Sequence, residues 1–282
     1  MPGEQGKTVT HGLILRDTDT KETDKILTVL TAEIETDDET ETEVQTETET
    51  KETDKILTVL TAEMGKIPVI ARGARRKNSR LAAACQLFAW SEMTLYKRGN
   101  WYYLDSADPE ELFAGLQKDL VRFALAAYLA ELTEFVTGEE NPAPELLRLL
   151  LNGLYALAKL NKDPALVKPA FTFRLLALAG FEPMIDGCAV CGAETALSPV
   201  LDVVQGVVHC RKCGGPGGES FPLSAACMTA LEHILHGSDR KLYSFTLMPE
   251  DLRLLDRAAE GFAAAQLERS FRTLGYYKAI LI

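Results

Sequence analysis

Two pairs of cysteines constrain the fold of this chain more than any other feature. Cys188 and Cys191 form one C-x2-C pair, and after eighteen intervening residues Cys210 and Cys213 form a second. Four thiolates on two tight turns can close a tetrahedron around Zn2+, and this spacing is typical of zinc ribbons. Because sulfur fills every coordination position, we expect one structural Zn2+ per chain and no catalytic metal.

Other interpretations of these cysteines stay open at this point. Four unrelated core cysteines would share the spacing by coincidence, and a redox-active C-x2-C pair would need a thioredoxin-like βαβ context that we do not find around it. His209 could also serve as a ligand in place of its neighbour Cys210. Cys85 and Cys227 stand alone, and for them packing in the core is the default expectation.

The acidic charge of the chain is concentrated in one segment. The formal net charge is -11, but residues 34–63 contain 11 acidic and 2 basic side chains, which leaves -2 for the other residues. Fourteen residues, TKETDKILTVLTAE, occur at 20–33 and again at 50–63. A solenoid array needs three or more copies, so we interpret the repeat as a local duplication. The Thr- and Glu-rich stretch between the copies predicts a solvated loop, the alternative being a phosphate mimic that folds onto a basic groove.

The sequence shows neither a secretory signal nor a membrane span. Its longest stretch without a charged residue is Ser220–Leu231, 12 residues, whereas a bilayer span needs about 18 or more. The first residues lack the basic and apolar regions of a signal peptide. We therefore expect a reducing cytoplasm, where cysteines bind metals more often than they form disulfides.

The pattern of apolar residues changes from strand-like to helical along the chain. Five short segments rich in β-branched residues predict strands and hence a small barrel. They are 9–16, 55–61, 67–72, 87–96 and 101–106, and Lys97–Asn100 is predicted to be the hairpin turn between the last two. Asp108 as N-cap, Pro109 at the first helical position and Glu111 as the capping-box partner then predict a helix that ends near Gly138. Further helix starts are expected near Pro144, Pro164 with Asp163 as cap, Ser224 and Pro249.

A basic stripe follows the third predicted strand. No Asp or Glu lies between residues 64 and 91. Within this stretch, five cations occur in nine residues: Arg72, Arg75, Arg76, Lys77 and Arg80. Such a stripe can follow a phosphate backbone, although a merely solvated face has the same composition. Six aromatic residues follow nearby: Phe88, Trp90, Tyr96, Trp101, Tyr102 and Tyr103. Bases can stack on those that face outward, and about half must face the core because strand side chains alternate.

Sequence motifs of the common catalytic sites are absent. The chain contains no GxxxxGK[ST], GxGxxG, HExxH or GxSxG motif. We therefore expect a protein that is not an enzyme.

Three segments in this order resemble the RecO family of bacterial DNA-repair and recombination-mediator proteins. They are GKIPVIARGARR at 65–76, which runs into ARGARRKNS at 71–79, then FRLLALAGFEP at 173–183, and directly after it the paired cysteines. The resemblance implies an α+β fold in which an N-terminal OB-fold β-barrel precedes a helical domain that carries a four-cysteine zinc ribbon. The domains it implies are 1–106 (OB-fold, with the acidic insert at about 34–63), 107–185 (helical), 186–222 (zinc ribbon) and 223–282 (C-terminal helices packed on the helical domain).

The resemblance also implies a function. RecO proteins bind single- and double-stranded DNA, anneal complementary strands, and help RecR to load RecA onto strands coated by single-stranded DNA-binding protein; this places the chain at the bacterial nucleoid. Arg174 is a candidate for binding the terminal carboxylate of that coating protein's C-terminal tail, unless its stem simply packs on a neighbouring helix. The insert departs from the family pattern, in which a single copy of the repeated strand leads to the segment at Gly65. Either copy of the repeat can supply the second strand, and negative charge in the added loop would oppose DNA.

Two competing functions have different consequences. A zinc-stabilised protein-interaction module would leave the basic stripe without a role. An OB-fold RNA-binding factor would use the same stripe and aromatic residues, because base stacking does not discriminate the sugar.

Overall fold

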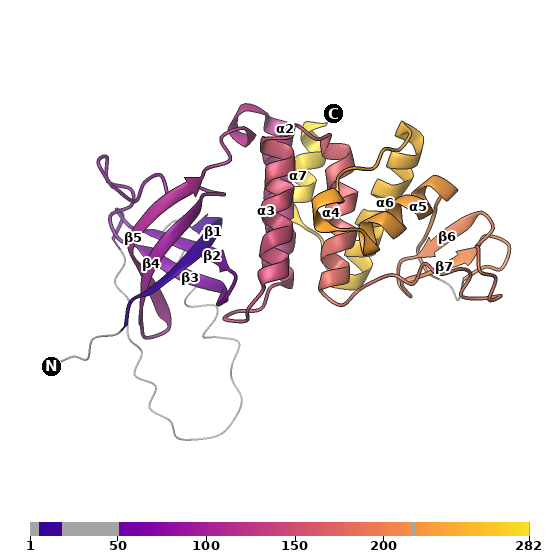
Figure 1. Cartoon of the computed structure of the whole chain (residues 1–282), viewed down its shortest axis with the longest axis horizontal. Coiled ribbons are helices and arrows are strands. Elements are labelled where there is room, and N and C mark those ends of the chain that lie inside the picture. Colours follow the sequence, from indigo (N-terminus) through magenta and orange to yellow (C-terminus); the bar gives the residue numbers. More distant parts are fainter. Residues whose placement is uncertain (1–5, 19–50, 216–217, 282) are drawn as a thin grey trace, which may run out of the picture. The chain divides into compact units, whose positions relative to one another are not determined.

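The computed structural model describes residues 6–18, 51–215 and 218–281. The chain divides into two compact units, one of residues 1–112 and 137–147 and the other of residues 113–136 and 148–282 (Figure 1). The first copy of the repeat, at 20–33, and the acidic stretch that follows it up to residue 50 lie outside the described residues.

The first unit is a closed five-stranded barrel. Its strand order is β1-β2-β3-β5-β4, with β3 and β5 parallel and every other neighbouring pair antiparallel. The strands are β1 (Thr8–Thr18), β2 (Lys55–Thr61), β3 (Gly65–Ala71), β4 (Trp90–Arg98) and β5 (Trp101–Glu111). The second copy of the repeat therefore supplies β2. This confirms the predicted α+β class with an OB-like barrel at the N-terminal side.

Alternate residues of the strands fill the barrel. Leu57 and Val59 of β2 and Ile67 and Val69 of β3 are buried in one apolar cluster with Met93 and Leu95 of β4. A period of two places these side chains on one face of each strand, which is the reason the β-branched segments form a barrel and not isolated hairpins.

The tight turn between β2 and β3 contacts the loop at residues 137–143. Gly65 has a φ of +63°, and a Cβ built on it would lie 1.9 Å from the carbonyl oxygen of Asn141. The backbone N–H of Glu140 donates to the carbonyl of Lys66 at 3.1 Å, and that of Ala143 to the carbonyl of Ala62 at 3.2 Å. Glycine is needed here because any side chain would meet backbone.

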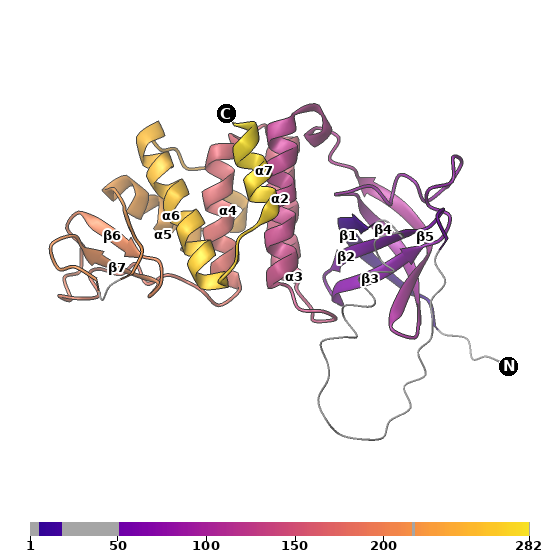
Figure 2. The ribbon, with the colours of Figure 1, turned by 180° about the vertical axis from the view of Figure 1, so that it is seen from behind.

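The second unit is a helical assembly with a small sheet. Its helices include α2 and α7, which contact each other and lie side by side in Figure 2, and α4, which contacts α6. The helices are α2 (Leu120–Val136), α3 (Pro144–Ala158), whose first turn falls in the first unit, α4 (Pro164–Leu178), α5 (Ala225–His236), α6 (Pro249–Leu267) and α7 (Arg272–Ile280), with short 3-10 turns at Leu116–Lys118 and Asp239–Lys241. In the described parts of the chain no helix is both long and apolar enough to cross a membrane.

The predicted start of the first helix was wrong. Asp108, Pro109 and Glu111 lie in β5, where Asp108 pairs with Glu92 of β4 and Pro109 with Ser91. The helix instead begins at Leu120, and the carboxylate of Asp119 accepts the backbone N–H groups of Val121 and Arg122. Pairing with β4 outweighs the local capping pattern, and the register shift at Trp90/Ser91 tolerates a proline, which has no N–H to donate.

The other helix starts were confirmed. As N-caps do, the carboxylate of Asp163 accepts a hydrogen bond from the N–H of Ala165, and the hydroxyl of Ser224 accepts one from the N–H of Cys227. Pro144 and Pro249 are the first residues of α3 and α6. Strand β4 starts three residues later than predicted, because Phe88 before it has a φ of +66° and cannot continue an extended strand. Helix α7 was not predicted.

Candidate metal centre and nucleic-acid interface

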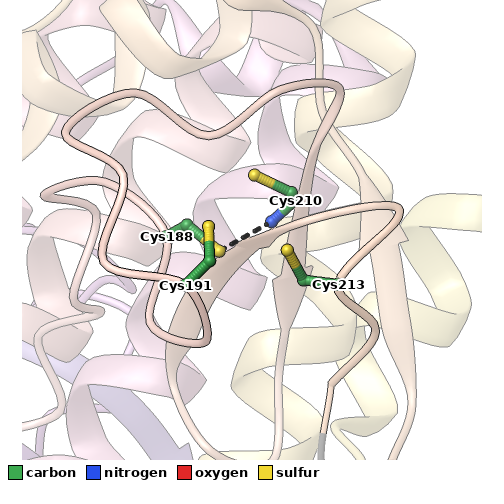
Figure 3. Close-up of side chains that lie close together, drawn as sticks. All are labelled: Cys188, Cys191, Cys210 and Cys213. Atoms are coloured by element: carbon green, nitrogen blue, oxygen red, sulfur yellow. Dashed lines mark hydrogen bonds between the residues drawn. The ribbon is translucent and has the colours of Figure 1, made fainter.

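Four cysteine side chains converge at a small three-stranded sheet of the second unit. Its strands are β6 (Pro199–Asp202), β7 (Val207–Cys210) and β8 (Ser220–Pro222), in the order β7-β6-β8. Cys210 ends β7 and Cys213 follows it, whereas Cys188 and Cys191 lie in the segment between α4 and β6. All four Sγ atoms lie within 4.8 Å of one another (Figure 3).

This sulfur cluster fits a tetrahedral metal ion. A Zn–S bond of about 2.3 Å places the sulfurs of a tetrahedral site about 3.8 Å apart, so small shifts of the side chains close the cluster around the ion. Cys188 and Cys210 are buried, and Cys191 and Cys213 are exposed. The cluster can hold a metal ion, and four sulfur ligands leave no position for a reacting water.

The surrounding backbone favours ionised sulfur. Backbone N–H groups of Cys191 and Cys210 lower the pKa of the Cys188 thiol to about 6, and the N–H of Cys210 lies 3.2 Å from its Sγ. In contrast, a hydrogen bond with the Cys191 sulfur raises the pKa of Cys213 to about 12. Four thiols this close cannot all ionise on their own, and a divalent cation is the kind of ion that would offset their mutual repulsion.

Neighbouring residues shape the centre without joining it. Gly187 has a φ of +89°, and a Cβ there would lie 2.4 Å from the carbonyl oxygen of Ala193, so the turn at the first cysteine pair requires glycine. His209 lies outside the group of four sulfurs, and its Nδ1 is 3.0 Å from the carbonyl oxygen of Cys210.

The five predicted cations lie together on the loop of residues 72–89 between β3 and β4. All five side chains are exposed: Arg72, Arg75, Arg76, Lys77 and Arg80. Arg75 lies 4.0 Å from Asp17 of β1, which is also paired with Lys55 at 2.6 Å. Within the part of the chain that the structure describes, Arg72, Arg76, Lys77 and Arg80 have no ion pair. We call these five residues the cationic stripe.

A buried carboxylate anchors the start of this loop. Asp54, which is 5% exposed, accepts the backbone N–H of Gly73 at 2.7 Å and that of Lys51 at 3.1 Å. The N–H of Arg75 donates to the carbonyl of Thr53 at 3.0 Å. Asp54 was not among the predicted site residues, although an Asp directly before a predicted strand is a turn signal. The anchor holds the cationic stripe in a defined place despite its lack of regular secondary structure.

The aromatic residues near the stripe divide between two faces of the barrel. Tyr102 packs against the interior cluster. Tyr96, Trp101 and Tyr103 belong to a separate cluster with Ile56 and Ile70. Phe88 is buried, and Trp90 is half-buried and stacks on His11.

Arg174 has partners inside the fold. It lies on α4, and its Nη1 donates to the carbonyl of Leu235 at 3.0 Å while its Nη2 donates to the carbonyl of Gly237. Both carbonyls are at the C-terminal end of α5, where a cation also interacts favourably with the helix dipole. The guanidinium is therefore engaged with α5.

Two family models together match most of the chain. The family model described as "Recombination protein O C terminal" matches residues 117–275, and "Recombination protein O N terminal" matches residues 40–113. The chain belongs to the RecO family. A DNA repair protein RecO of Anaeromyxobacter sp. (strain K) is 34% identical over 261 residues, which cover 92% of this chain and 91% of that protein. A DNA repair protein RecO of Acetivibrio thermocellus is 32% identical over 216 residues, which cover 77% of this chain and 86% of that protein.

Membership of the RecO family supports a role in DNA repair for this chain. RecO proteins are non-enzymatic recombination mediators, which agrees with the expectation drawn from the missing catalytic motifs. The RecO match at residues 40–113 includes the second copy of the repeat, the same copy that forms β2.

Proposed function

We propose that this chain is a DNA-binding recombination mediator that binds single- and double-stranded DNA through its barrel, anneals strands, and helps RecR to load RecA onto strands coated by single-stranded DNA-binding protein. The observation that carries the proposal is the cationic stripe, a row of exposed cations on an anchored loop of an OB-like barrel in a RecO-family chain. Four of its residues, Arg72, Arg76, Lys77 and Arg80, have no ion pair within the described residues, so phosphate binding there does not first have to break one.

Three stripe residues offer a direct test. Arg76, Lys77 and Arg80 are exposed and have no ion pair within the described residues, so replacing all three with Ala removes charge without breaking internal contacts. Each lost contact to a single strand lowers the salt slope of log K by about 0.7, so the slope becomes shallower by about 2 and affinity near 0.1 M salt falls by up to about 100-fold. Fluorescence anisotropy with labelled oligonucleotides across a salt series measures both.

A matched variant separates the stripe from total charge. Lys118, Arg240 and Lys241 are exposed cations of the second unit, and their replacement with Ala removes the same three charges. Their loss is expected to change affinity much less. Equal effects of the two triple variants, or an unchanged salt slope in the stripe variant, would show that the stripe is only a solvated face. Tighter binding to RNA than to DNA would favour the RNA-binding alternative.

The metal we propose for the cysteine cluster is one structural Zn2+ per chain, held by Cys188, Cys191, Cys210 and Cys213. Support comes from the four converging sulfurs and the N–H groups that stabilise thiolate. When bound, the ion would cross-link the two cysteine turns.

We further propose that the helical unit docks the C-terminal tail of single-stranded DNA-binding protein, with Arg174 as a candidate for its terminal carboxylate. The contacts of Arg174 with α5 define the competing role, that of holding the end of this helix. Arg174→Lys keeps the charge but loses the two-pronged contact. Calorimetry with a tail peptide should show weaker binding by this variant. A lower melting temperature with unchanged peptide affinity would assign Arg174 to the fold alone.

The cellular setting we propose is the bacterial cytoplasm at the nucleoid, where DNA and these partners occur together.

The domain limits we propose from the family resemblance remain 1–106, 107–185, 186–222 and 223–282. Limited proteolysis followed by mass spectrometry tests these limits; because β5 runs to Glu111, cleavage at the first boundary is expected after this strand and not at residue 106.

A further inference from the structure

The outer surface of the barrel carries a row of aromatic and apolar side chains. Ile56, Ile70 and Tyr103 are buried together, and Tyr96 and Trp101 pack against them. Their strand neighbours Leu57, Val69 and Leu104 belong to the interior cluster. Successive strand residues point to opposite faces, so the row lies on the outside of the barrel.

The row runs across four strands without a gap. Tyr96 of β4 is the cross-strand partner of Tyr103 of β5, Tyr103 pairs with Ile70 of β3, and Ile70 pairs with Ile56 of β2. The rings of Tyr96 and Tyr103 are stacked, with centroids 5.3 Å apart and planes 13° apart. Trp101 lies two residues before Tyr103 and therefore on the same face. We call Tyr96, Trp101 and Tyr103 the outer aromatic row.

Cations border this row on two sides. The guanidinium carbon of Arg72 lies 4.9 Å from the ring centroid of Tyr103, and Arg72 is the first residue of the cationic stripe. Arg98, which pairs with Trp101 at the hairpin, is also exposed. Asp105, further along β5, is paired with Lys7 at 2.7 Å. The row therefore joins a base-sized aromatic surface to the cations that can follow a phosphate backbone.

The exposure of the rings decides which of them a ligand can reach. Tyr103 is only 4% exposed, because Tyr96 and Arg72 cover it, whereas Tyr96 and Trp101 are half-buried. Each of these two keeps part of its surface free. Bases in a duplex are stacked on one another and hide their faces, so only unpaired bases can use such a surface.

We propose that Tyr96 and Trp101, flanked by Arg72 and Arg98, form a platform on which unpaired bases of single-stranded DNA stack outside the barrel. The inference rests on the proposed DNA-binding function and adds which aromatic side chains read single strands. The cationic stripe binds the backbone of either form of DNA, and the platform gives preference to the single strand.

The tryptophans make the platform directly observable. The chain has two, Trp90 and Trp101, and Trp90→Phe leaves Trp101 as the only one. In this variant, oligothymidylate is expected to quench the fluorescence of Trp101, whereas a duplex of the same length leaves it nearly unchanged. Trp101→Leu in the full chain should weaken single-strand binding at least about fivefold, and Trp101→Phe, which keeps an aromatic face, should weaken it less. The affinity of the Trp90→Phe protein for single strands should match that of the unaltered chain.

The outcomes separate the platform from DNA binding itself. Absence of quenching, or equal quenching by single strands and duplex, in a protein that binds DNA and loses affinity on removal of Arg76, Lys77 and Arg80 would overturn the platform and leave the proposed function standing. No binding of any DNA would remove the proposed function. The quenching measurement keeps Trp101 in place, so it remains decisive even if the Leu variant fails to fold.

Discussion

A buried lysine holds three helices of the second unit together, and its removal offers a quantitative test of that unit. Lys168 of α4 is 3% exposed. Its Nζ lies 3.0 Å from the carboxylate of Asp256, bonds to the carboxylate of Glu260, and is 5.4 Å from the ring centroid of Tyr277. Asp256 and Glu260 belong to α6, and Tyr277 belongs to α7. Lys168→Met keeps most of the volume of the side chain and removes its charge.

The magnitude follows from the burial of the partners. Removing one member of a fully buried ion pair costs about 3–5 kcal/mol, because it leaves an uncompensated charge. Here the side chains of Asp256 and Glu260 are 28% and 20% exposed, and Lys278 still bonds to Glu260 at 2.5 Å. Water and Lys278 offset part of the loss, so we expect the free energy of unfolding to fall by about 2 kcal/mol.

The effect should depend on pH through Glu260. Burial alone would raise the pKa of this carboxyl, but hydrogen bonds from Lys168 and Lys278 outweigh burial and lower it below the ordinary 4.5. A lowered pKa in the folded state contributes stability that is present above about pH 4.5 and lost as the pH falls through the folded value. Burial raises the pKa of Asp256 above its ordinary value, and Lys168 opposes this rise. Lys168 thus favours the ionised form of both carboxyls, and its loss costs less once they are protonated. The cost of Lys168→Met should therefore shrink as the pH falls below about 4.5.

Urea unfolding followed by circular dichroism measures these differences, and a double-mutant cycle with Glu260→Gln isolates the pair. Lys278→Met is the control, because this lysine bonds to the same carboxylate from a side chain that is 56% exposed and should cost far less. Unchanged stability of the Lys168→Met protein at neutral pH, or a cost that is the same at pH 7 and near pH 4, would refute the reasoning.

Three further predictions concern other parts of the chain. Cys210→Ser should reduce bound zinc from about one per chain and lower the melting temperature of the second unit without unfolding the barrel, because structural zinc contributes folding free energy locally; a metal-free protein after purification without chelator would contradict this. Gly65→Ala should destabilise the barrel by several times the cost of Gly99→Ala, since both residues have positive φ but only Gly65 has backbone 1.9 Å from the new Cβ; equal melting temperatures of the two variants would contradict it. Deletion of residues 34–63 should leave the circular dichroism spectrum of the folded protein intact, because residues 20–33 then precede Met64 with the same fourteen letters, and should strengthen DNA binding at low salt; loss of folding or equal affinity at low salt would contradict it.

Features that depend on short stretches of sequence could be predicted. The spacing of the four cysteines was enough to place their sulfurs in one cluster, because a C-x2-C turn brings its two thiols together wherever it occurs. The N-caps Asp163 and Ser224 bond to backbone only two or three residues away, so they too are readable from the chain. Exposure of the cationic stripe follows from its composition, since Arg and Lys side chains are almost never fully buried.

Features that depend on distant partners were decided by the tertiary structure. The segment Asp108–Glu111 carries a helix-capping pattern, yet it is a strand because β4 pairs with it. Arg174 and Lys168 find their partners 61 to 92 residues away, so neither the role of one nor the burial of the other is visible locally. The sequence predicted that about half of the aromatic residues face outward, and only the register of β4 against β5 showed that Tyr96, Trp101 and Tyr103 do so. A strand shifted by one residue exposes the opposite set of side chains, and that choice is made by pairing across the whole barrel.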